Sequence, residues 1–490
     1  MGKTPSLNLL KGTKTIEDTV KYVCLKEGEG DHEHEPLSAG ARFFHEPGFN
    51  VYILTKIGSK SSFDIDRTKA YLIQMIDKYP CFSQVVVKDK ESGSMKWVHT
   101  HVNIDDHLIV PDIEQNMDSS DQFIEDYISN LTVSCIDNLK PLWDVHILNT
   151  RTSDAQGTCI FRAHHSLGDG LSFMSMLLSL SRKASDPEEL PTLPMNMKAH
   201  HHTTTATNVI SFCMVLWNTF VALMLFVLTT MFLKDTETPM KASPGVEDRH
   251  RRIVTRSVSL ADIKLVKNAM NATVNDVIVG IVQAGFNRYL KGRYEEINSP
   301  VPENILLRAM MSYNLRASVN VDAATKNTNE DETWGYKVGY ILLPFNVKNR
   351  SDPLDYVREA KAIMERRKAS FEPFATRFFA KTLVPKLFGI KIAGKLNRKV
   401  YYNTTFGFSN MPGPKEELCF LQQKVTYLAP SIYGIPSGLM IHIISYVDKV
   451  TFVLSAEEET IPDPQKLCDD LEISLHHIKC SVLDKPCAEK

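Results

Sequence analysis

An uncharged apolar block lies near the middle of this chain, from residue 209 to residue 233. Its polar side chains are Ser, Asn and Thr, which a helix can satisfy internally, and a helix of this length can span a bilayer. A single crossing would put the two halves of the chain on opposite faces of a membrane, so no site could contain residues from both. We therefore expect a monotopic anchor that leaves both halves on one side. A re-entrant hairpin with its turn at Asn218–Thr219 is one alternative, and a buried helix of a soluble protein is another.

The block also divides the chain. A length of 490 residues is too great for one ordinary core, and strand-like and helix-like patterns are mixed in both halves, which favours an α/β or α+β fold. We expect an N-terminal domain over residues 1–195, a linker over 196–251 that contains the block, and a C-terminal domain over 252–490. Several cations that follow the block suit an anionic cytosolic surface; they are Lys234, Lys241, Arg249, Arg251 and Arg252.

Composition excludes some functions. The formal net charge of −2 provides no overall field that would attract nucleic acid. The nine cysteines are scattered without a CxxC pair, which indicates reduced thiols in a protein that faces the cytosol. The histidines at 32, 34 and 200–202 are expected in solvated loops, because no further ligands stand at metal-site spacing. We expect no metal and no cofactor.

Two apolar runs meet at the segment Ala163–Gly170, which reads AHHSLGDG. The run before it, 158–163, has the pattern of a buried strand, and the run after it, 171–180, has that of a buried helix. The segment is therefore a strand-to-helix corner. Adjacent histidines at such a corner cannot point the same way, so one can face a cavity while the other packs. Gly168 and Gly170, on either side of an aspartate, are expected to provide backbone angles or close approaches that a Cβ would forbid.

The corner carries groups that suit acid–base chemistry. A neutral imidazole, with an ordinary pKa of about 6.5, can accept a proton near neutral pH. A His-His pair followed by an aspartate between glycines is a narrower pattern than a lone buried histidine, so we favour catalysis over a structural role. Asp169 could orient an imidazole or hold the loop by a salt bridge, and the sequence leaves both open. No GxSxG, Walker A, GxGxxG or HExxH motif is present, which favours direct transfer by a general base.

The segment His164–Gly170 resembles the HHxxxDG signature of acyltransferases with the chloramphenicol-acetyltransferase-like fold. Further segments narrow the resemblance to the wax ester synthase/diacylglycerol acyltransferase family, plant type. Each segment is weak alone, and their order and spacing together are specific. They are residues 35–38, 44–47, 141–144, 275–277, 314–316, 343–345 and 409–414.

This resemblance implies two related domains around a central tunnel and an O-acyltransferase that moves a long-chain acyl group from acyl-CoA to a fatty alcohol or to diacylglycerol. His165 would be the general base, with His164 second in importance. The oxyanion would take hydrogen bonds from backbone N–H groups near Gly168–Gly170 or from a polar side chain of the second domain. The expected location is the endoplasmic reticulum membrane, or the plasma membrane, with the domains facing the cytosol. A condensation-type enzyme with a carrier-bound donor and a non-catalytic lipid-binding relative are the alternatives.

Residues of the second half complete the expected site. Thr273 or Asn275 would cap a helix, and Asn275 would then lie at its positive end, where it could contact a reacting group or act only as a cap. Within this site we assign Asp169 to holding the loop, with Arg316 as one conceivable partner. Residues 406–414 are expected to form a rigid turn after an apolar strand. The resemblance assigns Asn275 and residues 409–414 to signature blocks of the family. Asp276, Ser409 and Asn410 are further candidates for substrate binding or structural support. Tyr336 stands where the family usually has Asn, which puts the contact of that Asn in doubt.

Overall fold

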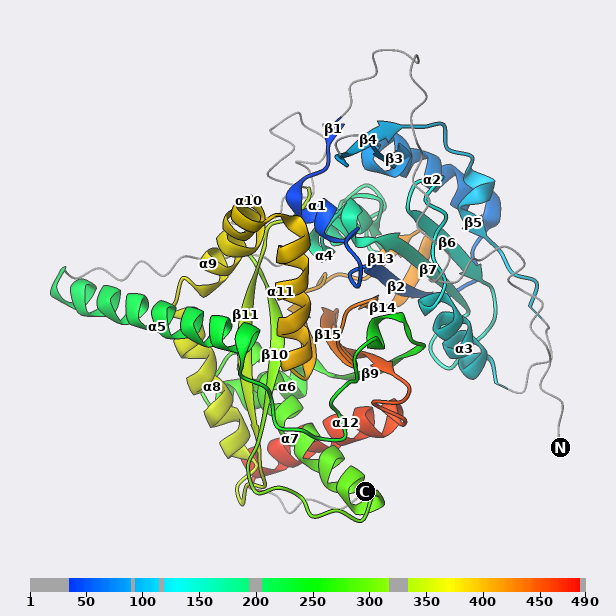
Figure 1. The fold of residues 1–490 in the computed structure, drawn as a ribbon. Helices are drawn as coiled ribbons and strands as arrows, with labels where there is room; N and C mark the ends of the chain where they lie inside the picture. The colour runs from blue at the N-terminus through cyan, green and yellow to red at the C-terminus, as the bar shows by residue number, and fades with distance from the viewer. Residues whose placement is uncertain (1–34, 90–92, 114–118, 194–204, 317–333, 485–490) are drawn as a thin grey trace.

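The computed structural model describes residues 35–89, 93–113, 119–193, 205–316 and 334–484, and from the helix at 205–231 it describes side chains beginning at residue 211. The histidine-rich stretches considered above lie outside these ranges. The chain forms two lobes, each with its own sheet and its own hydrophobic core (Figure 1).

The N-terminal lobe is built on a seven-stranded sheet with the order β5-β6-β7-β2-β14-β13-β8. Its neighbouring strands are antiparallel except for the pair β5 and β6. Strands β6 and β7 are buried along their whole length, which explains their nearly continuous apolar sequences. The strands are β2 (Tyr52–Ser59), β5 (Leu108–Ile109), β6 (Trp143–Leu148), β7 (Gly157–His164), β8 (Arg182–Lys183), β13 (Leu418–Phe420) and β14 (Gln423–Tyr433).

Helices and a small second sheet accompany this sheet. Side-chain caps begin all four helices of this lobe, since the hydroxyl or carboxylate of the residue before the first turn accepts from a backbone N–H. The helices are α1 (Ala39–Phe43), α2 (Ile65–Lys78), α3 (Ser120–Thr132) and α4 (Gly170–Ser179), and the small sheet contains β1 (Glu35–Pro36), β3 (Gln84–Lys88) and β4 (Met95–His99).

The C-terminal lobe has a six-stranded sheet with the order β11-β10-β12-β15-β16-β9. Strand β12 is parallel to both of its neighbours, and the other pairs are antiparallel. The strands are β9 (Arg251–Ser259), β10 (Ile305–Asn314), β11 (Val338–Val347), β12 (Phe406–Met411), β15 (Leu439–Tyr446) and β16 (Lys449–Glu457). The helices are α6 (Leu260–Ala269), α7 (Val274–Glu296), α8 (Leu354–Lys368), α9 (Glu372–Phe378), α10 (Val384–Phe388), α11 (Ile390–Asn403) and α12 (Pro464–Val482), with a π-helical turn η7 (Phe379–Leu383) between α9 and α10.

Strand β14 joins the lobes. It belongs to the C-terminal half of the sequence, yet it pairs along its length with β2, with Ser431 opposite Leu54 and Tyr433 opposite Tyr52. Its side chains Leu428 and Ala429 enter the N-terminal core. The domain boundaries expected from the sequence remain predictions, and by strand pairing the two halves are interlocked.

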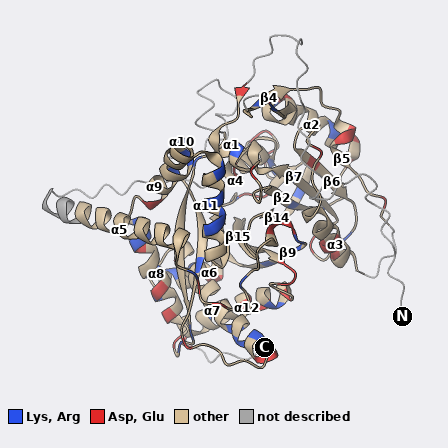
Figure 2. Ribbon diagram, in the orientation of Figure 1, with Lys and Arg blue, Asp and Glu red and all other residues tan. Residues whose placement is uncertain are grey.

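The apolar block forms helix α5 (Thr205–Met231), which extends away from the body of the protein (Figure 1). It carries no charged residue, and its described part is tan in Figure 2, the colour of residues other than Lys, Arg, Asp and Glu. The stretch Ser211–Met231 has a mean hydropathy of 2.1, and 11% of its most apolar window is buried, unlike a helix of a soluble core. Arg308 holds the end of the helix against the C-terminal lobe, since its Nε lies 2.6 Å from Asp235 Oδ1 and its Nη2 donates to the Leu233 carbonyl.

The hairpin alternative for this block is wrong, because α5 is one continuous helix through Asn218 and Thr219. Both polar side chains find partners without breaking the helix. Thr219 Oγ1 donates to the Val215 carbonyl at 2.7 Å, and Asn218 Nδ2 donates to the Ala369 carbonyl at 3.1 Å.

The turn expected over residues 406–414 is also partly wrong, because residues 406–411 are strand β12. The strand ends at Met411, and the turn that the Gly and Pro residues predict begins only at Pro412. Gly407 lies inside the strand for a packing reason, since a Cβ there would stand 2.2 Å from Met440 Sδ on the neighbouring strand.

Candidate active site

The strand-to-helix corner expected from the sequence is present. Strand β7 ends at His164, a short 3₁₀ turn covers His165–Leu167, and α4 begins at Gly170. Asp169 caps α4, because its Oδ1 accepts hydrogen bonds from the backbone N–H and the hydroxyl of Ser172, both at 3.0 Å. The chain therefore passes from strand β7 to helix α4 through a short segment that ends in the capping residue.

The role expected for the two glycines is wrong as to backbone angle. Gly168 has an extended backbone with φ of 172°, which any residue adopts. A Cβ on Gly168 would stand 3.2 Å from Ser172 Cβ, whereas a Cβ on Gly170 would meet nothing within 4 Å. Gly168 therefore serves close packing, and Gly170 leaves space in the cavity that it lines.

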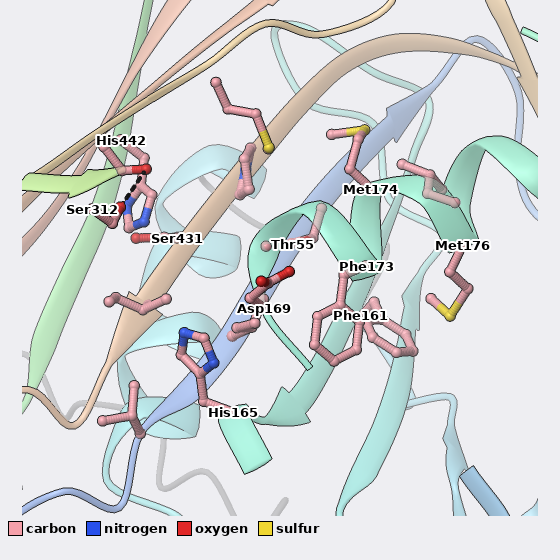
Figure 3. Close-up of a pocket in the computed structure, with 18 of the residues that line it drawn as sticks. Thr55, Phe161, His165, Asp169, Phe173, Met174, Met176, Ser312, Ser431 and His442 are labelled. Atoms are coloured by element: carbon pink, nitrogen blue, oxygen red, sulfur yellow. Dashed lines mark hydrogen bonds between the residues drawn. The ribbon is translucent and has the colours of Figure 1, made fainter. Parts of the chain in front are cut away.

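His165 lies on the wall of a large cavity between the lobes (Figure 3). Its Nδ1 is 2.9 Å from the Gly168 carbonyl and also contacts the Tyr336 hydroxyl, which donates to the same carbonyl at 3.1 Å. Since a carbonyl only accepts, Nδ1 carries the proton and Nε2 keeps its lone pair. The ring stacks on Phe44 with centroids 4.5 Å apart.

The electrostatic surroundings keep His165 neutral. Burial lowers the pKa of the imidazole and outweighs the raising effects of backbone hydrogen bonds and of Asp169, and the positive charge of Lys381 adds a smaller lowering effect. Burial also raises the pKa of Tyr336 well above its usual range, so its phenol stays a hydrogen-bond donor. A neutral histidine with an oriented ring has the form that a general base requires.

His164 faces protein rather than the cavity. Its Nδ1 accepts a hydrogen bond from the Ser166 backbone and lies 2.7 Å from the Ser166 hydroxyl. Its ring packs against His45 and Tyr52, and burial lowers its pKa well below the ordinary value. The two adjacent rings thus have different surroundings, and His164 anchors the turn that presents His165.

Asp169 and Arg316 form an ion pair between the lobes. Arg316 Nη1 is 2.7 Å from Asp169 Oδ2, and both side chains are 2% exposed. The same carboxylate oxygen accepts from the backbone N–H of Lys337, and Arg316 Nη2 donates to the Gly335 carbonyl. The carboxylate therefore holds the corner against the second lobe, the second of the two roles that the sequence left open.

The cavity is lined by both lobes and is mostly apolar. It encloses about 1,720 Å³, including the part open to solvent. On the N-terminal side it extends between β7, α2 and α4, where Phe161, Phe173, Met174 and Met176 lie beyond Asp169 (Figure 3). On the other side it reaches strands β10, β12, β14 and β15.

The remaining candidates divide between the cavity and its support. Ser409 lines the cavity. Asn410 Nδ2 donates to Asn275 Oδ1 at 2.8 Å, which ties β12 to the start of α7. Asp276 forms a capping box with Thr273, whose side chain accepts from the Asp276 backbone while the Asp276 carboxylate accepts from the Thr273 backbone. Thr273 is therefore the cap, and Asn275, Asp276 and Asn410 do not appear among the residues that line the cavity.

The sequence analysis did not assign four of the residues that line the cavity to the site, namely Tyr336, Ser312, Ser431 and His442. The resemblance identified Tyr336 only as a departure from the family, and its contact with His165 required the fold. Ser312, Ser431 and His442 lie on three different strands, and no local pattern marks them. Alternation along those strands could have shown which face they share, but it could not have shown that the face borders a cavity.

Comparisons with known proteins identify the family of this chain. Residues 43–278 match the wax ester synthase/diacylglycerol acyltransferase catalytic domain, and residues 334–479 match the WS/DGAT C-terminal domain. Wax ester synthase/diacylglycerol acyltransferase 11 of Arabidopsis thaliana is 41% identical over 470 residues, which cover 92% of this chain and 96% of that protein. Wax ester synthase/diacylglycerol acyltransferase 4 of the same plant is 39% identical over 479 residues, which cover 93% of this chain and 92% of that protein.

Solved structures share the fold. A wax ester synthase/diacylglycerol acyltransferase from Marinobacter aquaeolei VT8 superimposes with a TM-score of 0.58 at 21% identity, covering 91% of this chain and 99% of that one. The first condensation domain of the calcium-dependent antibiotic synthetase superimposes with a TM-score of 0.56 at 10% identity, covering 93% and 97%. The expected two-domain, chloramphenicol-acetyltransferase-like fold is confirmed. With the family domains matched on both lobes and relatives about 40% identical over nearly the whole chain, the protein belongs to the wax ester synthase/diacylglycerol acyltransferase family and is an acyltransferase.

Proposed function

We propose that the protein transfers a long-chain acyl group from acyl-CoA to the hydroxyl of a fatty alcohol or a diacylglycerol, with His165 as the general base. The observation that carries this proposal is the position of His165. Its ring borders an apolar cavity shared by both lobes, and its Nδ1 is occupied by the Gly168 carbonyl. Its Nε2 is then the nitrogen that can take a proton from a substrate.

The proposed reaction needs no cofactor beyond the acyl-CoA substrate. Nε2 of His165 removes the proton of the acceptor hydroxyl while the oxygen attacks the thioester carbonyl carbon. The resulting oxyanion requires donors, which are backbone N–H groups near Gly168–Gly170 or a polar side chain of the second lobe such as Ser409, which lines the cavity. The C–S bond then breaks, the ester forms, and the protonated imidazole returns its proton to the departing thiolate. The atoms balance as ester plus free coenzyme A.

The shape of the cavity supports a long acyl chain. Its extension into the N-terminal lobe is bounded by apolar side chains such as Met75, Phe161 and Leu177, which match the chemistry of an alkyl chain. The starter condensation domain of rhizomide synthetase, which shares this fold with a TM-score of 0.53, was solved with C8-CoA. A fold of this kind can therefore accommodate an acyl-CoA donor.

An acyl-transfer assay tests the proposal. Purified protein is incubated with radiolabelled palmitoyl-CoA and either hexadecanol or dioleoylglycerol, and the labelled esters are separated. We expect ester formation, and His165→Ala should lower kcat by about 10²–10⁴-fold, the usual contribution of a general base, while its circular dichroism spectrum matches that of the wild type. Near-normal turnover in the folded variant would reject His165 as the base.

We further propose that α5 anchors the protein to the cytosolic face of the endoplasmic reticulum, with the plasma membrane as the alternative site. Exposed apolar side chains continue from α5 onto α9–α11, where they include Phe371, Phe374, Phe378, Leu387 and Phe388. Exposed lysines at 386, 391, 395 and 399 accompany them, and Figure 2 shows such cations along α11. Apolar residues with adjacent cations are typical of a helix that lies in the interface of an anionic membrane.

A groove beside α5 supports delivery of acceptors from that membrane. It encloses about 1,490 Å³ between α5, η7 and α11, including the part open to solvent, and its lining is largely apolar. Phe44, Tyr336 and Tyr340 line both this groove and the cavity of His165. A lipid that enters beside α5 thus meets residues in contact with the catalytic ring.

Protease protection tests the topology. Epitope tags at the two ends of the chain should both be digested in intact microsomes, because a monotopic anchor leaves both lobes in the cytosol. The seven free cysteines of the described residues fit that reducing compartment. Protection of one tag and digestion of the other would show a single crossing and reject the monotopic arrangement.

A further inference from the structure

A row of polar side chains interrupts the apolar wall of the cavity. Ser312 of β10, Ser409 of β12 and His442 of β15 lie on adjacent strands, with Ser409 paired with His442 in register and the two serine hydroxyl oxygens 3.4 Å apart. Ser431 reaches the same place from β14 of the other sheet. Figure 3 shows Ser312, Ser431 and His442 gathered at one side of the cavity, apart from His165.

Two atoms of this group lack a partner within the described part of the chain. They are Nδ1 of His442 and Oγ of Ser431, both buried, and the Ser431 side chain is 1% exposed. Buried polar atoms in folded proteins nearly always form hydrogen bonds, because leaving one unpaired loses its hydration without replacement. Two unpaired atoms at the wall of a substrate cavity indicate that a substrate group completes their bonding.

The chemistry of the two side chains restricts that group. Burial, helped by the nearby His165, lowers the pKa of His442 to about 3, so the ring is neutral and offers one N–H donor. The Ser431 hydroxyl offers a second donor. A carbonyl oxygen has two lone pairs and can accept both hydrogen bonds, whereas an alkyl chain can accept none.

We propose that His442 and Ser431 bind an ester carbonyl of a diacylglycerol acceptor while His165 binds its free hydroxyl. The proposal rests on the proposed function and selects between its two acceptors. A fatty alcohol has one polar group, which the base uses, so it leaves the pair unsatisfied. A diacylglycerol carries ester groups a few bonds from its hydroxyl and can satisfy both positions at once. The acyl donor is directed elsewhere, because its chain fits the apolar extension in the N-terminal lobe.

Two matched acceptors measure the effect of the ester carbonyl on transfer. Dioleoylglycerol and dioleylglycerol, its diether analogue, have the same free hydroxyl and chain length and differ only in the ester carbonyls. The full-length protein with palmitoyl-CoA should show a kcat/KM ratio, diester over diether, of about ten, the factor expected for one or two hydrogen bonds to a buried site. Ser431→Ala and His442→Phe should each bring this ratio close to one.

A control variant separates this effect from a general effect of removing a buried hydroxyl. Ser175→Ala removes a buried hydroxyl that has no partner in the described part of the chain and does not line the cavity, and it should leave the ratio at the wild-type value. Melting temperatures of all three variants establish that they fold. If Ser431→Ala does not fold, His442→Phe carries the test alone.

The outcomes of the experiment distinguish a failure of the carbonyl site from a failure of the proposed function. A wild-type ratio near one, or variants that keep the wild-type ratio, would overturn the assignment of the carbonyl site even if acyl transfer is normal. The absence of transfer to any of the acceptors, hexadecanol included, would instead overturn the proposed function itself. A ratio that falls in the variants and persists in Ser175→Ala would support the site.

Discussion

At the scale of single residues, the neutral state of His165 has a consequence for pH dependence. The proposed base must be unprotonated, and burial lowers the pKa of His165 below the ordinary 6.5. The neutral form therefore predominates above pH 6.5 and is lost as the pH falls through the lowered pKa. We expect kcat/KM to change little from pH 8 to 7.5 and to reach half its maximum below pH 6.5, as measured in buffers of constant ionic strength. A midpoint above 6.5 would contradict the electrostatic account of the site.

Tyr336 is the second residue whose chemistry can be tested. Tyr336→Phe removes the hydroxyl at His165 Nδ1 and leaves the Gly168 carbonyl, at 2.9 Å, to hold the tautomer. One hydrogen bond contributes about 0.5–1.5 kcal/mol, so kcat should fall by about three- to tenfold, far less than in His165→Ala. Steady-state kinetics with dioleoylglycerol measure this.

The control for Tyr336→Phe is Tyr289→Phe, which removes a buried hydroxyl that has no hydrogen-bond partner among the described residues and lies outside the cavity lining, and it should leave kcat unchanged. A loss as large as that of His165→Ala would mean that Tyr336 itself transfers a proton. No loss would mean that the contact is unimportant for orienting the ring.

At the scale of elements, the buried ion pair of Asp169 and Arg316 helps to hold the corner between β7 and α4 to the second lobe. Arg316→Met leaves the Asp169 carboxylate buried without its partner, and breaking such a pair typically costs about 3–5 kcal/mol. The melting temperature should fall clearly. Replacing both partners, by Asp169→Asn with Arg316→Met, should recover part of the loss because no charge is then left unpaired.

An exposed pair provides the comparison for this prediction. Arg358 and Asp355 are 2.6 Å apart on the surface of α8, with side chains 55% and 42% exposed. Arg358→Met should lower the melting temperature far less than Arg316→Met does, because solvent screens exposed ion pairs. Equal effects of Arg316→Met and Arg358→Met would show that the pair between the lobes contributes little to stability.

At the scale of the whole molecule, the relation between α5 and the catalytic cavity is the feature to test. Val227→Trp places a large ring in the groove that joins them. We expect KM for dioleoylglycerol in vesicles to rise by about tenfold, a usual effect of a steric change in an apolar passage, and KM for soluble 1-octanol to stay constant. Leu225→Trp, on an exposed face of α5 outside the groove lining, should affect neither.

A different result would change the picture of substrate entry. If Val227→Trp raised KM for both acceptors equally, the substitution would act on the cavity itself. If it raised neither, acceptors would reach His165 by another opening between the lobes, and the groove would only help to seat α5 against the body of the protein.

Local sequence determined the elements of this protein. The apolar run of β7, the Asp169 cap of α4 and the Thr273–Asp276 capping box depend on neighbours within four residues, so their patterns predict them. The same holds for α5, whose length and lack of charge mark it without any tertiary contact. The signature at His164–Gly170 is also a local pattern, and its resemblance to the family signature allowed the class of reaction to be predicted.

Tertiary structure alone decided what surrounds the base. Tyr336, Ser431 and His442 are separated from His165 by more than a hundred residues, and strand β14 reaches the N-terminal sheet only because its apolar face completes that core. Whether a polar residue on a strand meets solvent, a partner or a cavity depends on which sheet packs opposite it. That packing is a property of the whole fold, because burial is shared among elements distant in sequence, and no local pattern contains it.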